Sequence, residues 1–286
     1  MFLYRSNSKM NDLSDLKRKA LEARIAVLEM VYGASEGHIP SALSLVEILT
    51  VLYYKVLNIN PEDPKNPDRD RFILSKGHGC CALYAILADL GFFPKDELDK
   101  FLTFEGILGG HPEMQKVPGI EVSTGSLGQG LSMAIGMAIS AKLLSKQHKI
   151  YCVIGDGECN EGSIWEAAQA APHFKLDNLV VIVDQNLHQS SGRVWDVIDP
   201  LDLAKKWESF GWSVINVGGH DMTHIYGVLQ FIPLVVNRPT AVIARTIKGK
   251  GISFMEDQIK WHTSVPSREE YEVAMKELNG YKEVLG

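Results

Sequence analysis

The stretch 150–191, IYCVIGDGECNEGSIWEAAQAAPHFKLDNLVVIVDQNLHQSS, decides the fold class of this chain. A run of β-branched and apolar residues ends at Ile154, the glycine turn 155–157 follows it, and a helical pattern occupies about 163–174. A second apolar run, 179–184, completes the unit. This order predicts two parallel strands joined by a helix, because parallel strands need a long crossover connection.

The same alternation extends from this unit in both directions. We expect the strands at 71–75, 149–154, 179–184, 212–217 and 240–246, and further helices at about 11–34, 43–57, 80–90, 131–144 and, on the surface, 269–278. Alternating strands and helices predict an α/β fold with a mostly parallel sheet and helices on both faces. The 286 residues, 45% of them hydrophobic, suit a single domain that spans residues 1–286.

The charge and the cysteine content of the chain exclude several classes of partner. A formal net charge of −6 argues against nucleic acid and anionic membranes, which attract basic proteins. Residues 1–6 lack the apolar core of a signal peptide, and no apolar run approaches the roughly 18 residues of a membrane span. Four cysteines without C-x-x-C spacing indicate reduced thiols. We therefore expect a soluble, cytoplasmic protein.

Asp156 and Asn186 are the candidate metal ligands. They lie about one βαβ unit apart, so each follows the carboxyl end of a parallel strand, where ligands bind in open α/β sheets. One carboxylate and one amide oxygen, with a backbone carbonyl just after Asn186, suit Mg²⁺, which completes its shell with phosphate and water. A lone GDG is usually an ordinary turn, but the strand, the helix and the spacing around this one favour a phosphate-bound metal. Glycine on either side of Asp156 lets backbone approach that phosphate.

Several motifs of this chain resemble those of transketolases, which depend on thiamine diphosphate. The pattern GDG followed about 30 residues later by Asn is similar to the general motif for that cofactor, and its wording at 155–167 and 175–179 resembles transketolases specifically. The resemblance covers nearly the whole chain and includes EGH at 36–38, SKGH at 75–78, GHP at 110–112, TGSLGQG at 124–130, KGKG at 248–251 and WH at 261–262. It implies the family's diphosphate-binding fold.

The resemblance also implies how the cofactor is held. Mg²⁺ would be bound by Asp156, Asn186 and the carbonyl of His188, with Ca²⁺ or Mn²⁺ as substitutes. The diphosphate would contact Gly157, His78, Lys248 and His262, and basic groups around a phosphorylated ligand are electrostatically reasonable in an acidic protein. The rest of the cofactor would be lined by Ser41 and by Gly125, Ser126 and Leu127, the last three near the aminopyrimidine.

Catalytic roles follow from the same resemblance. His38 and His262 would move protons at substrate oxygens, and His111 would hold a hydroxyl of the donor; histidine suits such tasks because it titrates near neutral pH. Glu161 matches an acid near the family's subunit interface. The other histidines, His148, His173, His220 and His224, are interpreted as surface or satisfied core residues. Arg193 and Lys250 are candidates for recognition of a substrate phosphate, although solvated surface charge is the favoured interpretation. Pro40 departs from many relatives and puts the acceptor side of the pocket in doubt.

The chain is shorter than the transketolases that it resembles. Those enzymes carry a second domain with the glutamate that activates the aminopyrimidine, and we expect this domain on a separate chain. The hypothesis is that this chain is the N-terminal subunit of a split transketolase and pairs with a C-terminal subunit in an α₂β₂ assembly. The assembly would transfer a two-carbon ketol unit from a ketose phosphate to an aldose phosphate.

Two alternatives to this hypothesis stay open at the level of the sequence. One is another enzyme subunit on the same cofactor, similar to 1-deoxyxylulose-5-phosphate synthase or to the α subunit of a 2-oxo acid dehydrogenase. The other is a non-catalytic, cofactor-binding regulatory subunit.

Overall fold

A five-stranded parallel sheet forms the centre of the part of the chain, residues 13–285, that this computed structural model describes. The spatial order is β1 (Arg71–Leu74), β2 (Ile150–Gly155), β3 (Leu179–Gln185), β5 (Thr240–Arg245) and β4 (Ser213–Gly218). Each neighbouring pair is parallel, which confirms the predicted fold class. The expected start of the first helix, near Asn11, and residues 1–6 lie outside the described residues.

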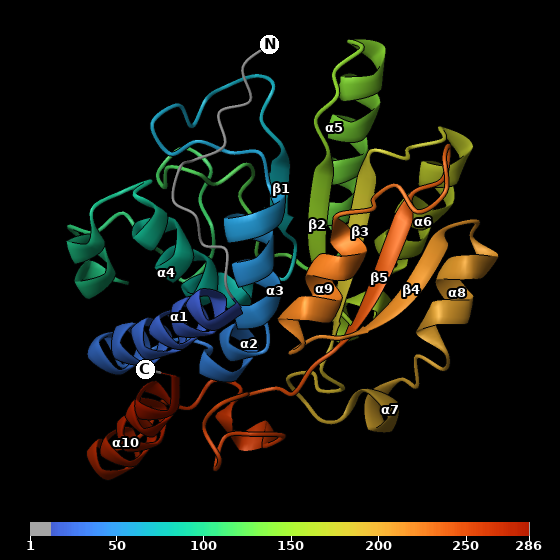
Figure 1. Ribbon diagram of the computed structural model, residues 1–286. Coiled ribbons are helices and arrows are strands. Elements are labelled where there is room, and N and C mark those ends of the chain that lie inside the picture. Colours follow the sequence, from blue (N-terminus) through green and yellow to red (C-terminus); the bar gives the residue numbers. More distant parts are fainter. Residues whose placement is uncertain (1–12, 286) are drawn as a thin grey trace.

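Alternate residues of the central strands enter two separate apolar cores. In β3, Val180 and Ile182 join one core, while Leu179, Val181 and Val183 join the other, as the two-residue period of a strand requires. The first core is covered by α1 (Leu13–Ala34), α3 (Val46–Val51), α4 (Cys80–Leu90) and α9 (Met222–Leu229), and the second by α5 (Gly130–Leu143), α6 (Gly162–His173) and α8 (Leu203–Ser209) (Figure 1). Burial on both faces explains the continuous apolar runs of these strands.

The helix predicted at 43–57 is wrong in its start and its continuity. A short helix, α2 (Ile39–Leu43), comes first; Pro40 fits its first turn, where no backbone N–H is needed. A tight turn then joins α2 to α3, and the last five residues, Leu52–Val56, form a π-helical turn. The change from α-helical to π-helical hydrogen bonds leaves the spacing of apolar residues nearly unchanged. The spacing alone therefore does not reveal where one helix ends and the next begins.

The C-terminal helix α10 (Arg268–Leu285) is longer than predicted and is not only a surface element. Its Ala274 and Leu278 are completely buried, and the ring of Tyr271 stacks on Tyr32 of α1 with 4.0 Å between the ring centroids. Helix α10 therefore belongs to the same core as α1. No helix within residues 13–285 is long and apolar enough to span a bilayer.

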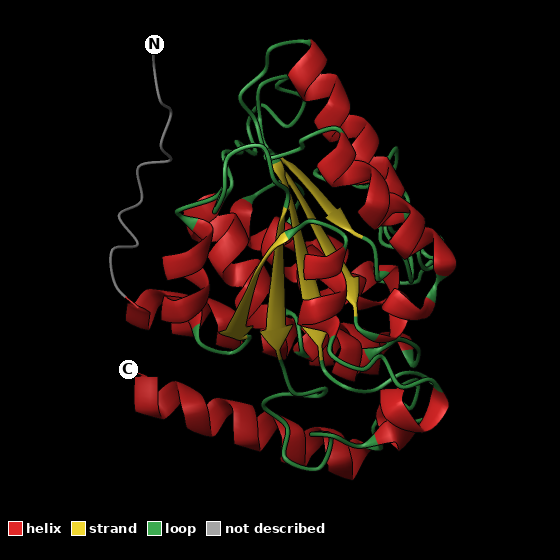
Figure 2. Ribbon diagram, turned by 90° about the vertical axis from the view of Figure 1, so that its right-hand side faces the viewer, coloured by secondary structure: helices red, strands yellow, loops and turns green. Residues whose placement is uncertain are grey.

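The carboxyl ends of the strands face the loops that precede α10 (Figure 2). Gly155 of β2 pairs with Asp184 of β3, so Asp156 and Asn186 leave the sheet at the same edge. A short α7 (Val194–Val197) and two 3₁₀ turns, Gly157–Asn160 and Ile259–Trp261, also lie in the segments that follow strand ends. The parallel register thus gathers the candidate site residues at one end of the molecule.

Candidate functional site

The Asp156 side chain joins its own turn to the segment after β3. The Asp156 carboxylate accepts from the backbone N–H of Leu187 at 2.6 Å and from that of Gly157 at 2.9 Å. Leu187 has a positive φ of 65°, an uncommon backbone conformation that turns the chain directly after Asn186. Asp156 and Asn186 are 1% and 4% exposed, so both side chains are buried at this sheet edge.

The electrostatics of Asp156 suit a bound cation. Burial, followed by the charge of Asp184, raises the pKa of Asp156 to about 7. A positive ion beside the carboxylate would oppose both effects. The described residues contain no cluster of three or more His, Cys, Asp or Glu side chains with metal-binding geometry. One carboxylate and one amide oxygen are donors that suit a hard ion, which takes most of its shell from a ligand and water.

The His188 side chain faces back toward its own loop. Its backbone N–H donates to the amide oxygen of Asn186 at 3.1 Å, and its ring Nδ1 lies 3.0 Å from the backbone carbonyl of Asn186. These contacts fold residues 186–188 into a tight unit. Both the backbone and the ring of His188 therefore lie against Asn186.

Asp184 is a buried carboxylate that the sequence analysis did not single out. It accepts from Lys76 Nζ at 2.5 Å, from Ser44 Oγ at 2.7 Å, from Asn186 Nδ2 at 3.0 Å and from Thr246 Oγ1. Burial raises the pKa of Asp184, but Lys76 and these hydrogen bonds outweigh it and hold the pKa below its usual value. The hydrogen bond from Asn186 Nδ2 to Asp184 thereby fixes the orientation of the Asn186 amide. The sequence signal that could have revealed Asp184 is an acidic residue directly after the apolar run 179–183.

Glu158 is a second buried acid that the sequence analysis missed. It is 2% exposed and accepts from Ser75 Oγ at 2.5 Å, from the N–H of Gly128 at 2.8 Å and from the N–H of Gly155 at 3.0 Å. These three partners belong to the SKGH, TGSLGQG and GDG motifs. One carboxylate therefore ties together three of the segments in which candidate cofactor contacts lie.

Four histidines from distant parts of the chain meet at this end of the sheet. The ring centroid of His38 lies 5.5 Å from that of His78, 6.3 Å from that of His111 and 5.4 Å from that of His262. His78 and His262 are 5.8 Å apart. Lys248 Nζ lies 2.8 Å from His262 Nδ1 and joins the cluster. The structure thus brings together the four histidines and the lysine that the sequence motifs marked.

Within this cluster, His38, His78, His262 and Lys248 have lowered pKa values and hold their protons less tightly than usual. Burial, and then the charge of Lys248, lowers the pKa of His262 to about 3, while burial and Lys76 lower that of His78 still further. Burial and the neighbouring His111 also lower the pKa of His38. Burial and Lys76 bring the pKa of Lys248 down to about 8. An anionic ligand would oppose these shifts, so the cluster fits one.

Glycines let the surrounding loops come close to the cluster. A Cβ on Gly125 would lie 3.3 Å from the His111 ring, and one on Gly157 would lie 3.2 Å from Gln189 Cβ. Ser126 of the same loop is exposed, Leu127 is half-buried, and Ser41 is buried in α2. Glu161 is exposed and lies beside Gly128, where a Cβ would be 2.7 Å from Glu161 Cβ.

The residues interpreted as surface or structural groups have partners of their own. His220 is satisfied by Glu47 at 2.9 Å and by the N–H of Ile247 at 2.8 Å. Lys250 pairs with Glu256 at 3.2 Å, and the guanidinium of Arg193 lies over the Trp195 ring at 5.4 Å. Cys80, Cys81, Cys152 and Cys159 are all buried free thiols.

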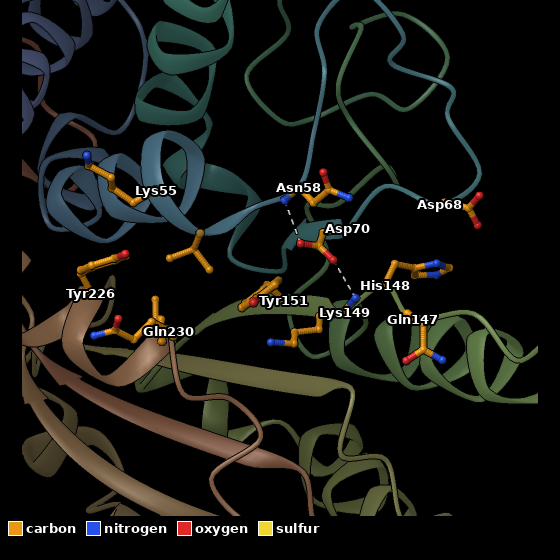
Figure 3. Close-up of a pocket in the computed structure, with 12 residues that line it drawn as sticks. Lys55, Asn58, Asp68, Asp70, Gln147, His148, Lys149, Tyr151, Tyr226 and Gln230 are labelled. Atoms are coloured by element: carbon orange, nitrogen blue, oxygen red, sulfur yellow. Dashed lines mark hydrogen bonds between the residues drawn. The ribbon is translucent and has the colours of Figure 1, made fainter. Parts of the chain in front are cut away.

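Two cavities lie at opposite ends of the sheet. One of about 680 Å³ adjoins the candidate metal ligands and is lined by residues that include Asn186, His188, Arg193 and His220. The other, of about 290 Å³, lies at the amino ends of β1 and β2 and contains none of the candidate site residues (Figure 3). Asp70 lines this second cavity and accepts from the N–H groups of Asn58 and Lys149 at 2.8 and 2.7 Å.

Comparisons with known proteins identify relatives of this chain. The family model described as "Transketolase, thiamine diphosphate binding domain" matches residues 16–284. A relative from Phocaeicola vulgatus, named as a subunit of apulose-4-phosphate transketolase, is 43% identical, and the match covers 92% of this chain and 94% of that relative. The 6-deoxy-6-sulfo-D-fructose transketolase subunit SqwG of a Clostridium species is 40% identical, with 92% and 96% covered.

A solved structure gives the same result at the level of the fold. The transketolase from Campylobacter jejuni superimposes with a TM-score of 0.86 at 32% identity. The match covers 94% of this chain but 43% of that enzyme. The chain therefore spans less than half the length of this transketolase, whereas it spans nearly all of the two relatives whose names call them subunits.

Proposed function

Because this chain belongs to the transketolase N-terminal, thiamine diphosphate-binding family, we propose that it is one half of a split transketolase whose other half is a separate C-terminal subunit. The two chains would transfer a two-carbon ketol unit from a ketose phosphate to an aldose phosphate in an α₂β₂ assembly. Near full-length matches to relatives named as transketolase subunits support a partner chain. The proposal includes a cytoplasmic location, in keeping with four free cysteines.

The observation that carries this proposal is the meeting of two groups at one sheet edge. The Asp156 and Asn186 pair would hold Mg²⁺ together with the carbonyl of His188, and Ca²⁺ or Mn²⁺ would substitute. Next to it, Gly157, His78, Lys248 and His262 would contact the diphosphate. When bound, thiamine diphosphate supplies the electron sink for cleaving a carbon–carbon bond beside a carbonyl.

The histidines would act on the sugar. His38 and His262 are close neighbours whose lowered pKa values favour the neutral imidazole, and such a group can take up or release a proton at a substrate hydroxyl. His111 is the most exposed of the four and would hold a hydroxyl of the donor. Ser41, Gly125, Ser126 and Leu127 would line the organic part of the cofactor. Glu161, exposed next to the TGSLGQG segment, would meet the neighbouring subunit.

Ketol transfer by the two purified chains together tests the proposed reaction. The donors to compare are xylulose 5-phosphate, apulose 4-phosphate and 6-deoxy-6-sulfofructose, since two relatives are named for the last two. We expect activity only when both chains and an aldose acceptor are present. Full activity of this chain alone would refute the split assembly. Cofactor binding without turnover of any donor would favour a regulatory subunit instead.

Cofactor binding tests the metal assignment. Calorimetry on the assembled complex should show thiamine diphosphate binding that depends on Mg²⁺, and Asp156→Ala should abolish that dependence. Asp70→Ala is the matched control, because Asp70 is also a buried carboxylate that accepts two backbone N–H groups, but at the opposite end of the sheet. Retained Mg²⁺ dependence in Asp156→Ala would count against this ligand.

A further inference from the structure

Helix α4 holds the loop that carries His111 through two side chains. Cys80 and Tyr84 are four residues apart and so lie on the same face of the helix. The Tyr84 hydroxyl lies 3.0 Å from the carbonyl oxygen of Gly109 and 2.9 Å from that of His111. Cys80 Sγ lies 3.2 Å from the carbonyl oxygen of Gly110. Three successive carbonyls therefore face one helix.

The Tyr84 hydroxyl is a shared donor in a buried setting. Tyr84 is 0% exposed, and burial raises its pKa, so the group stays protonated. The carbonyls of residues 109 and 111 would lose this donor together if the hydroxyl were removed, and buried carbonyls without a donor are costly. The next carbonyl of the loop, that of Pro112, accepts from the N–H of Thr124 at 3.2 Å, which leads into the TGSLGQG segment.

The same helix also fixes a second histidine. His78 lies in the 3₁₀ turn Gly77–Gly79, which runs directly into the first residue of α4. His78 is thus held by chain connectivity, and His111 by the Tyr84 and Cys80 contacts. His38 stands between them, with ring centroids 5.5 and 6.3 Å away. Movement of the 109–111 backbone would change the place of His111 relative to both.

We propose that Tyr84 is a positioning residue that sets the place of His111 in the site. The inference rests on the proposed function, in which His111 holds a hydroxyl of the donor. Tyr84→Phe removes only the hydroxyl and keeps the ring that packs near Phe101, with 6.4 Å between centroids. The loop should then loosen while the fold remains.

The test compares Tyr84→Phe with wild type in the assembled enzyme, using the ketose phosphate that supports the highest activity. We expect kcat/KM for the donor to fall about tenfold, because a small misplacement of a contact group costs up to roughly a hundredfold. KM for the acceptor should stay unchanged, and the amides of 109–111 should exchange hydrogen faster. Tyr151→Phe is the matched control, since Tyr151 is equally buried but lines the cavity of Figure 3.

A second background separates a positioning role from general damage. In a His111→Ala enzyme, adding Tyr84→Phe should change donor kcat/KM by less than about twofold. The reason is that Tyr84 affects the donor only by positioning His111, whose side chain is already absent. A further tenfold loss in the double variant would overturn the inference. Should Tyr84→Phe fail to fold, Cys80→Ala removes the thiol contacts to the carbonyls of Gly109 and Gly110 and should show a smaller loss confined to the donor. Equal losses for donor and acceptor would overturn the inference.

The outcomes also distinguish this inference from the proposed function. Impaired donor kinetics in His111→Ala beside unchanged kinetics in Tyr84→Phe would overturn the inference alone. Wild-type kinetics in His111→Ala would overturn the proposed role of His111, and the inference with it.

Discussion

Lys76 Nζ lies 2.5 Å from Asp184 Oδ2, and both side chains are almost completely buried. The pair joins the turn after β1 to the end of β3 beneath the candidate metal ligands. Ser44, Thr246 and Asn186 also donate to Asp184, so its charge is balanced by one cation and three neutral donors. Buried ions of this kind persist only when their partners are in place.

Loss of Lys76 should strongly destabilise the chain. Lys76→Met leaves the Asp184 charge buried without its cation, for which we expect a loss of about 3–5 kcal/mol in the free energy of unfolding. Urea unfolding of the chain measures this. The double variant Lys76→Met/Asp184→Asn removes both charges and should recover part of the loss. A single variant as stable as wild type would show that the pair is not held in the folded chain.

The free energy of unfolding should depend on pH through the carboxyl group of Glu47. Burial raises the pKa of Glu47, but Arg24 at 2.6 Å and His220 at 2.9 Å outweigh it and hold the pKa below 4.5. A carboxyl with a lowered pKa stabilises the folded state above its unfolded pKa, and this contribution disappears as the pH falls through the folded pKa. Glu47→Gln should therefore be destabilised at pH 7, and the difference from wild type should shrink below about pH 4.5.

Urea unfolding between pH 3.5 and 7 measures the Glu47 effect. Glu272→Gln is the control, because Glu272 pairs with Arg268 on the exposed surface of α10, where ion pairs contribute little. This control should follow the wild-type curve at every pH. A Glu47→Gln curve parallel to wild type down to pH 3.5 would contradict the prediction.

Helix α10 should contribute to the core through Leu278. This side chain is 0% exposed, so Leu278→Ala removes buried methyl groups and leaves a cavity, at a cost of about 2–5 kcal/mol. The side chain of Val273, on the same helix, is 49% exposed, so Val273→Ala should cost far less. Thermal unfolding measured by circular dichroism compares the two. Equal effects would mean that α10 is not packed on α1 in solution.

Two glycines should respond to alanine in opposite directions. Gly227 lies inside α9 with no atom within 4 Å of an added Cβ, so Gly227→Ala should stabilise by about 0.5–1 kcal/mol. Gly249 has a φ of +83°, and an added Cβ would lie 2.4 Å from the Met255 carbonyl oxygen, so Gly249→Ala should destabilise. Urea unfolding of both variants checks the signs. A stable Gly249→Ala would disprove the close approach.

Strands β2, β3 and β5 were predictable because they are buried on both faces, whereas the partly exposed strand β4 was indicated by its β-branched residues. The expected runs 149–154, 179–184, 212–217 and 240–246 differ from the observed strands by at most one residue at either end. Helices were less certain where hydrophobic spacing continues through a change of hydrogen-bond pattern, as between α2 and the π-helical turn Leu52–Val56. The end of α10 was missed because Gly280 lies inside that helix, although glycine usually marks a helix end.

The sequence by itself determined the α/β class, the shared sheet edge of Asp156 and Asn186, and the family, because these depend on local periodicity, spacing and motif wording. Only the tertiary structure decided which groups balance the buried charges: Lys76 for Asp184, and Ser75 with two glycine N–H groups for Glu158. It alone brought four histidines within ring contact and set Tyr84 against the His111 loop. Such partners are distant along the chain, and burial, which forces them together, exists only in the folded state.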